Sequence, residues 1–328
     1  MTTSLLDVED LNVSFHMRHR SLHAVRGITF TLHEGQTIGI VGESGCGKSA
    51  AAKALVQLHP RHNTTIQGKV LYKGQNLLEL SDRQMQRVRG KEISMIFQDP
   101  MSSLNPTMKI GTQITEGIKR HHPELSSQAI RQQAIDMLSK VGIPSPELRF
   151  DAYPHTLSGG MRQRVMIALA LVCQPHLLIA DEPTTALDVT IQAQILDLLK
   201  KIKQDGNMSI ILITHDLSVV AHFCDRVLVM YAGKIVEDAP VHQLFSQPQH
   251  PYTKRLLLAI PRLDQAKNQS LHPIEGMPPN LSLPLKGCGF CTRCEDAMHI
   301  CAEQGPELIH VGPHHRAACF KHDKRARP

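Results

Sequence analysis

The chain has 328 residues, of which 41% are hydrophobic, so it is long enough for one large domain and an extension. Its net charge of +6, with histidine neutral, is mild and does not by itself indicate a nucleic-acid partner. No run approaches the roughly 18 apolar residues needed to span a bilayer, and the first ten residues lack the basic and apolar regions of a signal peptide.

The first 95 residues or so are expected to form short strands with turns, such as Glu34-Gly35 and Lys73-Gly74. The apolar, β-branched segment Thr37–Val41 predicts a buried strand, and residues 49–55 are rich in strong helix formers. Between them lies a G-x4-G-K-S loop, and strand, loop and helix in this order predict a phosphate-binding P-loop. The loop consists of Gly42, Glu43, Ser44, Gly45, Cys46, Gly47, Lys48 and Ser49.

The chemistry of this loop follows from its residue types. Glycines let backbone N–H groups turn toward phosphate oxygens, and the helix N-terminus adds positive dipole. We expect Lys48 to reach the β- and γ-phosphates of a nucleotide and the Ser49 hydroxyl to bind Mg²⁺. A structural glycine-rich turn is the competing interpretation.

Gln98 follows another short apolar strand. Its uncharged amide could hold a metal or an attacking water, although the signal is weak alone. Residues 100–165 are then expected to be mainly helical, because apolar residues recur at near-helical spacing over 128–141 before Pro144 and Pro146 interrupt the pattern. A second glycine-rich element, Leu-Ser-Gly-Gly-Met, occupies 157–161.

The apolar segment 177–180 predicts a strand that ends in two carboxylates. Downstream of a P-loop, such a pair supplies a metal ligand and a base, so we assign Asp181 to Mg²⁺ and Glu182 to polarising the attacking water. A surface Asp-Glu pair is the alternative. His215 ends a further buried strand, where it could hold the γ-phosphate or be structural, and 227–231 and 234–237 predict a hairpin.

Five of the eight cysteines lie in the last 41 residues, after a proline-rich stretch at 273–284. This density, without a signal peptide, favours a metal over disulfides. Zinc held by four cysteines is compatible with such spacing. The five are Cys288, Cys291, Cys294, Cys301 and Cys319.

Together these motifs resemble the nucleotide-binding subunit of ATP-binding cassette (ABC) transporters. In family order they are Walker A at 42–49, the Q-loop at Gln98, the signature at 157–161, Walker B at 177–182, the D-loop at 186–188 and the switch histidine His215. The one visible departure is Met161, where glutamine is commoner. The resemblance implies an α/β P-loop NTPase fold with a RecA-like core, an antiparallel β subdomain and a helical subdomain.

The resemblance also implies how the site works. The signature residues Ser158, Gly159 and Gly160 would meet the ATP of a partner subunit, so that two ATP molecules lie between two subunits. Asp188 belongs to the D-loop of that arrangement. Phe15 falls where the family places an aromatic residue that stacks on adenine, with an ordinary core phenylalanine as the alternative.

A narrower resemblance, to the peptide and nickel importer subfamily, is carried by 97–106, by 250–261 and by the cysteine-bearing tail. It implies a [4Fe–4S] cluster with ligands matching Cys288, Cys294, Cys301 and Cys319, and Zn²⁺ remains the competitor. Cys291 departs from the pattern and could replace a neighbouring ligand.

The expected organisation is a nucleotide-binding domain at 1–260, with its helical subdomain at about 100–165, and a small cysteine-rich C-terminal extension at 261–328. The expected function is ATP hydrolysis that drives peptide import at the cytoplasmic face of the inner membrane. Its partners would be a similar or identical ATPase, two membrane permeases and an extracytoplasmic solute-binding protein, with no nucleic acid. The alternatives are import of nickel or another small solute, a non-transport ABC ATPase, and a nucleotide-gated regulatory protein.

Overall fold

The computed structural model describes residues 3–18, 20–99, 103–184, 189–259 and 274–323. It divides the chain into two compact units. The first unit comprises Met1–His33, Thr37–Leu78 and Ile213–Pro328, and the second comprises Glu34–Gln36 and Glu79–Leu212. Each unit therefore collects segments that are distant in the sequence.

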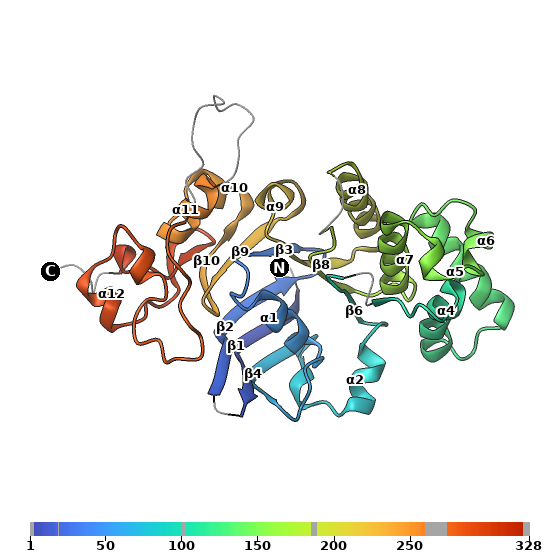
Figure 1. Ribbon diagram of the computed structural model, residues 1–328, viewed down its shortest axis with the longest axis horizontal. Coiled ribbons are helices and arrows are strands. Elements are labelled where there is room, and N and C mark those ends of the chain that lie inside the picture. The colour runs from blue at the N-terminus through green and yellow to red at the C-terminus, as the bar shows by residue number, and fades with distance from the viewer. Residues whose placement is uncertain (1–2, 19, 100–102, 185–188, 260–273, 324–328) are drawn as a thin grey trace. The chain divides into compact units, whose positions relative to one another are not determined.

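The first unit contains an antiparallel sheet whose strand order is β2-β1-β4-β5 (Figure 1). Val8 lies between Phe30 and Val70 in the register, and all three side chains are buried. The strands are β1 (Ser4–Met17), β2 (Arg20–His33), β4 (Thr64–Tyr72) and β5 (Gln75–Asn76). The prediction of short strands is wrong for β1 and β2, which have 14 residues each. Register shifts break their alternation of buried and exposed residues, which hides their length in the sequence.

The same unit contains a second set of strands around the central strand β3 (Thr37–Val41), which is fully buried as predicted. Strand β9 (Arg226–Tyr231) runs parallel to β3 and forms a hairpin with β10 (Lys234–Pro240). The predicted hairpin is confirmed, and Ala232 and Gly233 at its turn both have positive φ, 48° and 79°.

The C-terminal segment extends this set of strands. Strand β12 (His315–Ala317) pairs with β10, and β11 (Ile309–Gly312) pairs with β12. The remaining elements of the unit are α1 (Lys48–Leu55), η1 (Leu77–Glu79, at its boundary), α9 (Leu217–Phe223), α10 (Val241–Ser246), α11 (Pro251–Leu258), η3 (Cys291–Arg293), α12 (His299–Glu303) and η4 (Phe320–His322).

The second unit contains parallel strands β6 (Ile93–Ile96) and β7 (Leu177–Asp181), and β8 (Ser209–Ile213) ends at its boundary. Helices α4, α5, α6 and α7 pack on one another and appear together in green in Figure 1. The helices are α2 (Asp82–Val88), α4 (Ile110–His121), α5 (Ser127–Lys140), α6 (Pro146–Phe150), η2 (Pro154–Thr156), α7 (Gly159–Leu171) and α8 (Val189–Gly206).

Helix α5 confirms the helix predicted over 128–141. Its buried residues include Ile130, Ala134 and Leu138, which recur at helical spacing, and the Ser126 hydroxyl caps it by accepting from the N–H of Ala129. The helix ends at Lys140, before Pro144 and Pro146.

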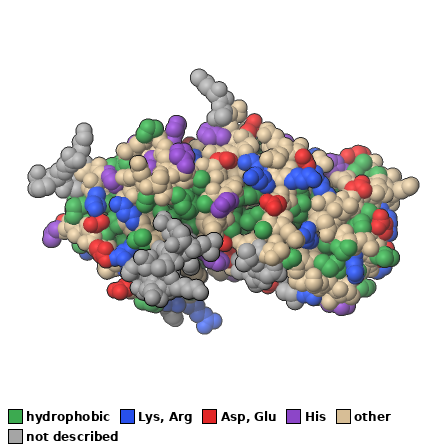
Figure 2. All heavy atoms as spheres, turned by 90° about the horizontal axis from the view of Figure 1, so that it is seen from above, with side chains coloured by type: hydrophobic (Ala, Val, Ile, Leu, Met, Phe, Trp, Pro, Cys, Tyr) green, Lys and Arg blue, Asp and Glu red, His purple; other side chains and the backbone are tan. Residues whose placement is uncertain are grey.

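Basic and acidic side chains are interspersed over the face drawn in Figure 2, in keeping with the mild net charge. Among the helices of the described ranges, none combines the length and apolar character required for crossing a bilayer.

Candidate functional site

The P-loop leaves the buried end of β3 and enters α1, as predicted. Gly42 and Gly47 have φ of 150° and 105°. A Cβ at Gly42 would lie 2.2 Å from the carbonyl oxygen of Met230, and one at Gly47 would lie 2.2 Å from that of Ala24. Backbone cannot easily move aside, so these two positions require glycine.

The Lys48 side chain lies across the loop, and only 6% of the residue is exposed. Its ammonium group donates to the carbonyl oxygens of Gly42, at 2.7 Å, and Glu43, at 3.1 Å. These bonds hold the loop around the positive charge of Lys48, and a loop arranged in this way is suited to binding a phosphate. Ser44 and Gly45 are exposed, Ser49 is half-buried, and burial raises the pKa of the Cys46 thiol.

Glu43, the second residue of the loop, is held by residues from far along the chain. Its backbone N–H donates to the phenol oxygen of Tyr252 at 2.8 Å. Its carboxylate accepts two hydrogen bonds from the guanidinium of Arg293, at 2.7 and 3.0 Å. This pairing and a bond to Tyr231 raise the pKa of Arg293 above its ordinary value.

Two further predicted residues belong to the first unit. His215 is exposed two residues after the end of β8, and the next residue, Asp216, caps α9 by accepting from the N–H groups of Ser218 and Val219. Phe15 on β1 is half-buried and meets the ring of His59 edge-on, with centroids 5.1 Å apart. Phe15 is therefore not a fully buried core residue.

The carboxylate pair ends β7 in the second unit. Asp181 is 2% exposed, whereas Glu182 is half-buried and has a φ of 49°. A positive φ is unfavourable for a residue with a side chain and is typically tolerated at functional positions. The amide of exposed Gln98 donates to the Glu182 carboxylate at 2.8 Å. The structure thus brings together two residues that are 84 positions apart.

The signature element opens helix α7. The Ser158 hydroxyl caps the helix by accepting from the N–H of Met161 at 3.3 Å, and Gly159 and Gly160 form its first turn. Ser158 and Gly159 are exposed, so free backbone N–H groups and the helix dipole are presented at a surface suited to an anion. Asp188, the remaining residue predicted for the nucleotide site, lies outside the described residues.

Comparison with known proteins identifies the family. A family model described as "ABC transporter" matches residues 25–185, and one described as "Oligopeptide/dipeptide transporter, C-terminal region" matches 236–301. The chain is 50% identical over 323 residues to the dipeptide transport ATP-binding protein DppD of Bacillus subtilis, covering 98% of this chain and 96% of that one. The chain belongs to the ABC transporter family.

Other relatives agree. The oligopeptide transport ATP-binding protein OppD of Escherichia coli is 49% identical over 318 residues, covering 97% of this chain and 93% of that one. A dimeric post-hydrolysis structure of the ATP-binding cassette MJ0796, bound to ADP and Pi, has a TM-score of 0.65 and 26% identity, covering 72% of this chain and 98% of that one. The predicted ABC cassette fold is confirmed, and this member of the family is an ATP-binding ATPase.

The five C-terminal cysteines of this ABC ATPase line one small cavity, together with Phe290 and Met298. The pKa of the Cys288 thiol is raised to about 11, chiefly by burial and further by Cys301, Cys319 and Cys294. Over the described ranges, no three histidine, cysteine, aspartate or glutamate side chains converge as a metal site. The donor type and number suit a soft metal, but the predicted cluster is not confirmed, because the thiols surround the cavity without converging on one point.

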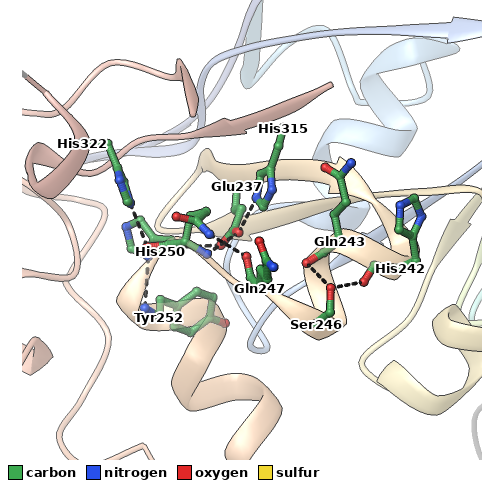
Figure 3. Close-up of polar contacts among 10 residues, drawn as sticks. Glu237, His242, Gln243, Ser246, Gln247, His250, Tyr252, His315 and His322 are labelled. Carbon is green, nitrogen blue, oxygen red and sulfur yellow. Dashed lines mark hydrogen bonds and ion pairs between the residues drawn. The ribbon is translucent and has the colours of Figure 1, made fainter. Parts of the chain in front are cut away.

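The cavity belongs to a segment tied down by buried polar groups (Figure 3). The fully buried Glu237 accepts from His315 Nε2 at 2.7 Å and from the N–H groups of Gln249 and His250, and Figure 3 shows His315 and His250 on either side of it. His250 Nδ1 in turn accepts from the N–H of Tyr252 and caps α11. The pKa of His250 is lowered to about 3, mainly by burial.

Sequence reasoning missed Arg293, Tyr231 and the role of Tyr252. Arg293 stands between two cysteines and Tyr231 ends a strand, so neither has a local signal for a contact at the nucleotide loop. Buried Gln163 was also missed, and its amide donates to the carbonyl oxygen of Pro183, next to Glu182. Only the tertiary structure shows that these residues contact the nucleotide loop or the residues next to Glu182.

Proposed function

We propose that this ATPase energises the uptake of dipeptides or oligopeptides by a multi-subunit transporter. The observation that carries the proposal is the 50% identity with a dipeptide transport ATP-binding protein over 98% of the chain. The match of residues 236–301 to the C-terminal region of oligopeptide/dipeptide transporters supports it, because that match lies outside residues 25–185, which the general ABC transporter model covers.

The proposed roles in hydrolysis follow from the residue types and contacts. Lys48 exchanges its bonds to the loop carbonyls for the β- and γ-phosphates of ATP, and the loop N–H groups orient those phosphates. Glu182 accepts a proton from the attacking water, and His215 donates to the γ-phosphate. Gln98 holds the Glu182 carboxylate and can orient the water.

Mg²⁺, when bound, would neutralise charge on the phosphates, and the groups proposed to hold it are Ser49, Asp181 and Gln98. Their hydroxyl, carboxylate and amide oxygens are the ligand types that Mg²⁺ prefers. Phe15, half-exposed on β1, is proposed to stack on the adenine.

We further propose that the active unit contains two ATPase subunits. Ser158, Gly159 and Gly160 present an exposed helix N-terminus, which would bind the γ-phosphate of ATP held by the neighbouring subunit. Asp188 would lie at the same contact. The neighbour is a similar or identical chain, and two permeases and an extracytoplasmic solute-binding protein complete a transporter that holds the ATPases at the cytoplasmic membrane face.

The domains are proposed to be a nucleotide-binding domain at 1–260, with a helical subdomain at about 100–165, and an extension at 261–328. We propose that the extension holds a metal centre, since its five cysteines share one cavity. Cys288, Cys294, Cys301 and Cys319 would ligate a [4Fe–4S] cluster or Zn²⁺, with Cys291 as a substitute. Binding would require the thiols to lose protons and turn inward.

Transport is tested by co-purifying the chain with its membrane partners and reconstituting them in liposomes. We expect ATP-dependent uptake of dipeptides or oligopeptides. Uptake of nickel or another solute in their place would favour the alternative importers. A lack of uptake of any of these would contradict the proposal, and ATPase activity stimulated by ribosomes or DNA would favour a non-transport role.

The metal proposal has its own test. Iron, acid-labile sulfide and zinc are measured in protein purified without oxygen, alongside a Cys294→Ser/Cys301→Ser variant and, as a control, a Cys173→Ser variant, whose cysteine is outside the cavity. About four iron and four sulfide per chain support the cluster, and about one zinc supports the competitor. Metal content that is absent, or unchanged in the cavity variant, would contradict a metal centre.

A further inference from the structure

We propose that Arg293 is a positioning residue for ATP binding, through which the cysteine-bearing tail holds the nucleotide loop. Arg293 neutralises the Glu43 carboxylate and fixes it in place, so that this carboxylate does not oppose the phosphates of ATP. The proposal rests on the ATP-binding activity and not on the transported substrate.

All the donor directions of the Arg293 guanidinium are used, and 4% of the side chain is exposed. Its two terminal nitrogens donate to the two carboxylate oxygens of Glu43 in a fork-to-fork pair. The same nitrogens reach the Tyr231 hydroxyl at 3.1 Å and the carbonyl oxygen of Ile274 at 3.0 Å, and Nε donates to the carbonyl oxygen of Glu275 at 2.9 Å. Such a bidentate pair fixes orientation as well as charge.

The Glu43 residue is held at three points. Its carboxylate accepts hydrogen bonds from Arg293 in the tail, and its backbone N–H donates to Tyr252 on α11. Its carbonyl oxygen accepts from Lys48 within the loop. The conformation of the loop therefore depends on residues 209 and 250 positions away. This dependence is specific, because each group of Glu43 has its own partner.

The negative charge of Glu43 explains why its pairing with Arg293 matters for nucleotide binding. Glu43 is the only acidic residue of the loop 42–49, which binds the phosphates of a highly charged anion. An unpaired carboxylate there would repel the nucleotide, and the repulsion would be strong because the Glu43 side chain is only 25% exposed. Arg293 offsets this charge from the side of the tail.

The position of Arg293, and so its contact with Glu43, depends on the conformation of the tail. Arg293 ends the short helix η3 (Cys291–Arg293), between two of the cysteines that line the cavity. Its guanidinium lies 5.8 Å from the ring centre of Tyr231 and 5.9 Å from that of Phe290, and Phe290 packs on Tyr252 with centroids 5.4 Å apart. A change that reorders this turn would therefore displace the partner of Glu43.

The first experiment compares Arg293→Ala with a matched control, Arg316→Ala. Arg316 also belongs to the tail and pairs with a buried carboxylate, that of Asp238, and in the described residues its hydrogen bonds and ion pair go to Asp238 and not to the loop 42–49. Binding of a fluorescent ATP analogue, the KM for ATP, kcat and the melting temperature are measured on the full chain. We expect Arg293→Ala to raise Kd and KM about tenfold with a smaller change in kcat. Arg316→Ala should lower the melting temperature and leave Kd unchanged.

The second experiment tests the charge directly. Adding Glu43→Gln to Arg293→Ala should restore Kd to within about threefold of the wild type, since the unpaired charge is gone. Should Arg293→Ala fail to fold, Arg293→Lys is measured in its place. Its Kd for the analogue should rise about threefold, because lysine keeps the positive charge but cannot form the two parallel hydrogen bonds to the carboxylate.

Either of two results would overturn the proposal. One is that Arg293→Ala and Arg316→Ala bind the analogue equally well. The other is that the double variant melts like the wild type yet binds as weakly as Arg293→Ala.

Discussion

The side chain of Gln98 donates a 2.8 Å hydrogen bond to the carboxylate of Glu182. The contact follows from strand pairing, because Ile96 on β6 lies beside Ala180 on β7 in a parallel register. Two residues further along each strand, the amide and the carboxylate leave the sheet at the same edge. An amide stays uncharged at every ordinary pH, so it orients Glu182 without competing for a proton.

The first prediction concerns this carboxylate. Glu182→Gln should lower kcat at least 100-fold, because an amide cannot accept the proton of the attacking water. ATP binding should persist, and the variant should accumulate as an ATP-bound dimer, seen by size-exclusion chromatography with and without ATP. Turnover close to the wild-type rate would show that another group is the base.

The second prediction compares two glycines of the P-loop. Gly47→Ala should destabilise the protein by about 3 kcal/mol or more, because the new Cβ would lie 2.2 Å from the carbonyl oxygen of Ala24 and φ is 105°. Gly45→Ala should cost about 1 kcal/mol, since its φ of 77° is unfavourable but no atom lies within 4 Å of the new Cβ. Denaturant unfolding without nucleotide measures both. Equal losses would mean that Ala24 moves aside.

The third prediction concerns pH. The pKa of His250 is about 3 in the folded chain, through burial and then the charge of His322, against an ordinary 6.5. The unfolded chain takes up a proton below pH 6.5 that the folded chain does not, so stability is retained above that pH and lost as the pH falls. From pH 7.5 to 5.5 the loss from His250 alone is about 1.4 kcal/mol.

His250 donates its backbone N–H to Glu237 and accepts from the N–H of Tyr252, and His322 and Phe290 also lie near its ring. The chain has 20 histidines, so the wild type is compared with His250→Asn, in which asparagine can still cap α11. The free energy of unfolding of the variant should fall less steeply with acid. Parallel curves would show that His250 is protonated normally when folded.

The fourth prediction concerns the anchor drawn in Figure 3. Glu237→Ala should destabilise the protein by about 3 kcal/mol or more, because two backbone N–H groups and His315 would lose their buried acceptor. Glu237→Gln retains one acceptor oxygen and should cost less. Limited proteolysis should cut the segment around β12 sooner in the alanine variant. Unchanged cleavage and melting would show that Glu237 does not anchor the tail.

Much of the candidate site follows from local sequence. The P-loop, the signature and the two carboxylates are recognisable because each needs particular residues within a few positions, such as glycine at positive φ or an apolar strand before Asp181. The same locality explains the correct prediction of α5 and of the hairpin β9–β10. The lengths of β1 and β2 escaped prediction because bulges disrupt the alternation that marks a strand.

The sequence alone determined the nucleotide chemistry and the family resemblance of this protein, since backbone conformation and motif spacing are set by near neighbours. Only the tertiary structure decided that Arg293 meets Glu43, that Tyr252 meets the same residue, and that β12 joins β10. Contacts across such separations depend on how buried surfaces pack, and no local pattern encodes that packing.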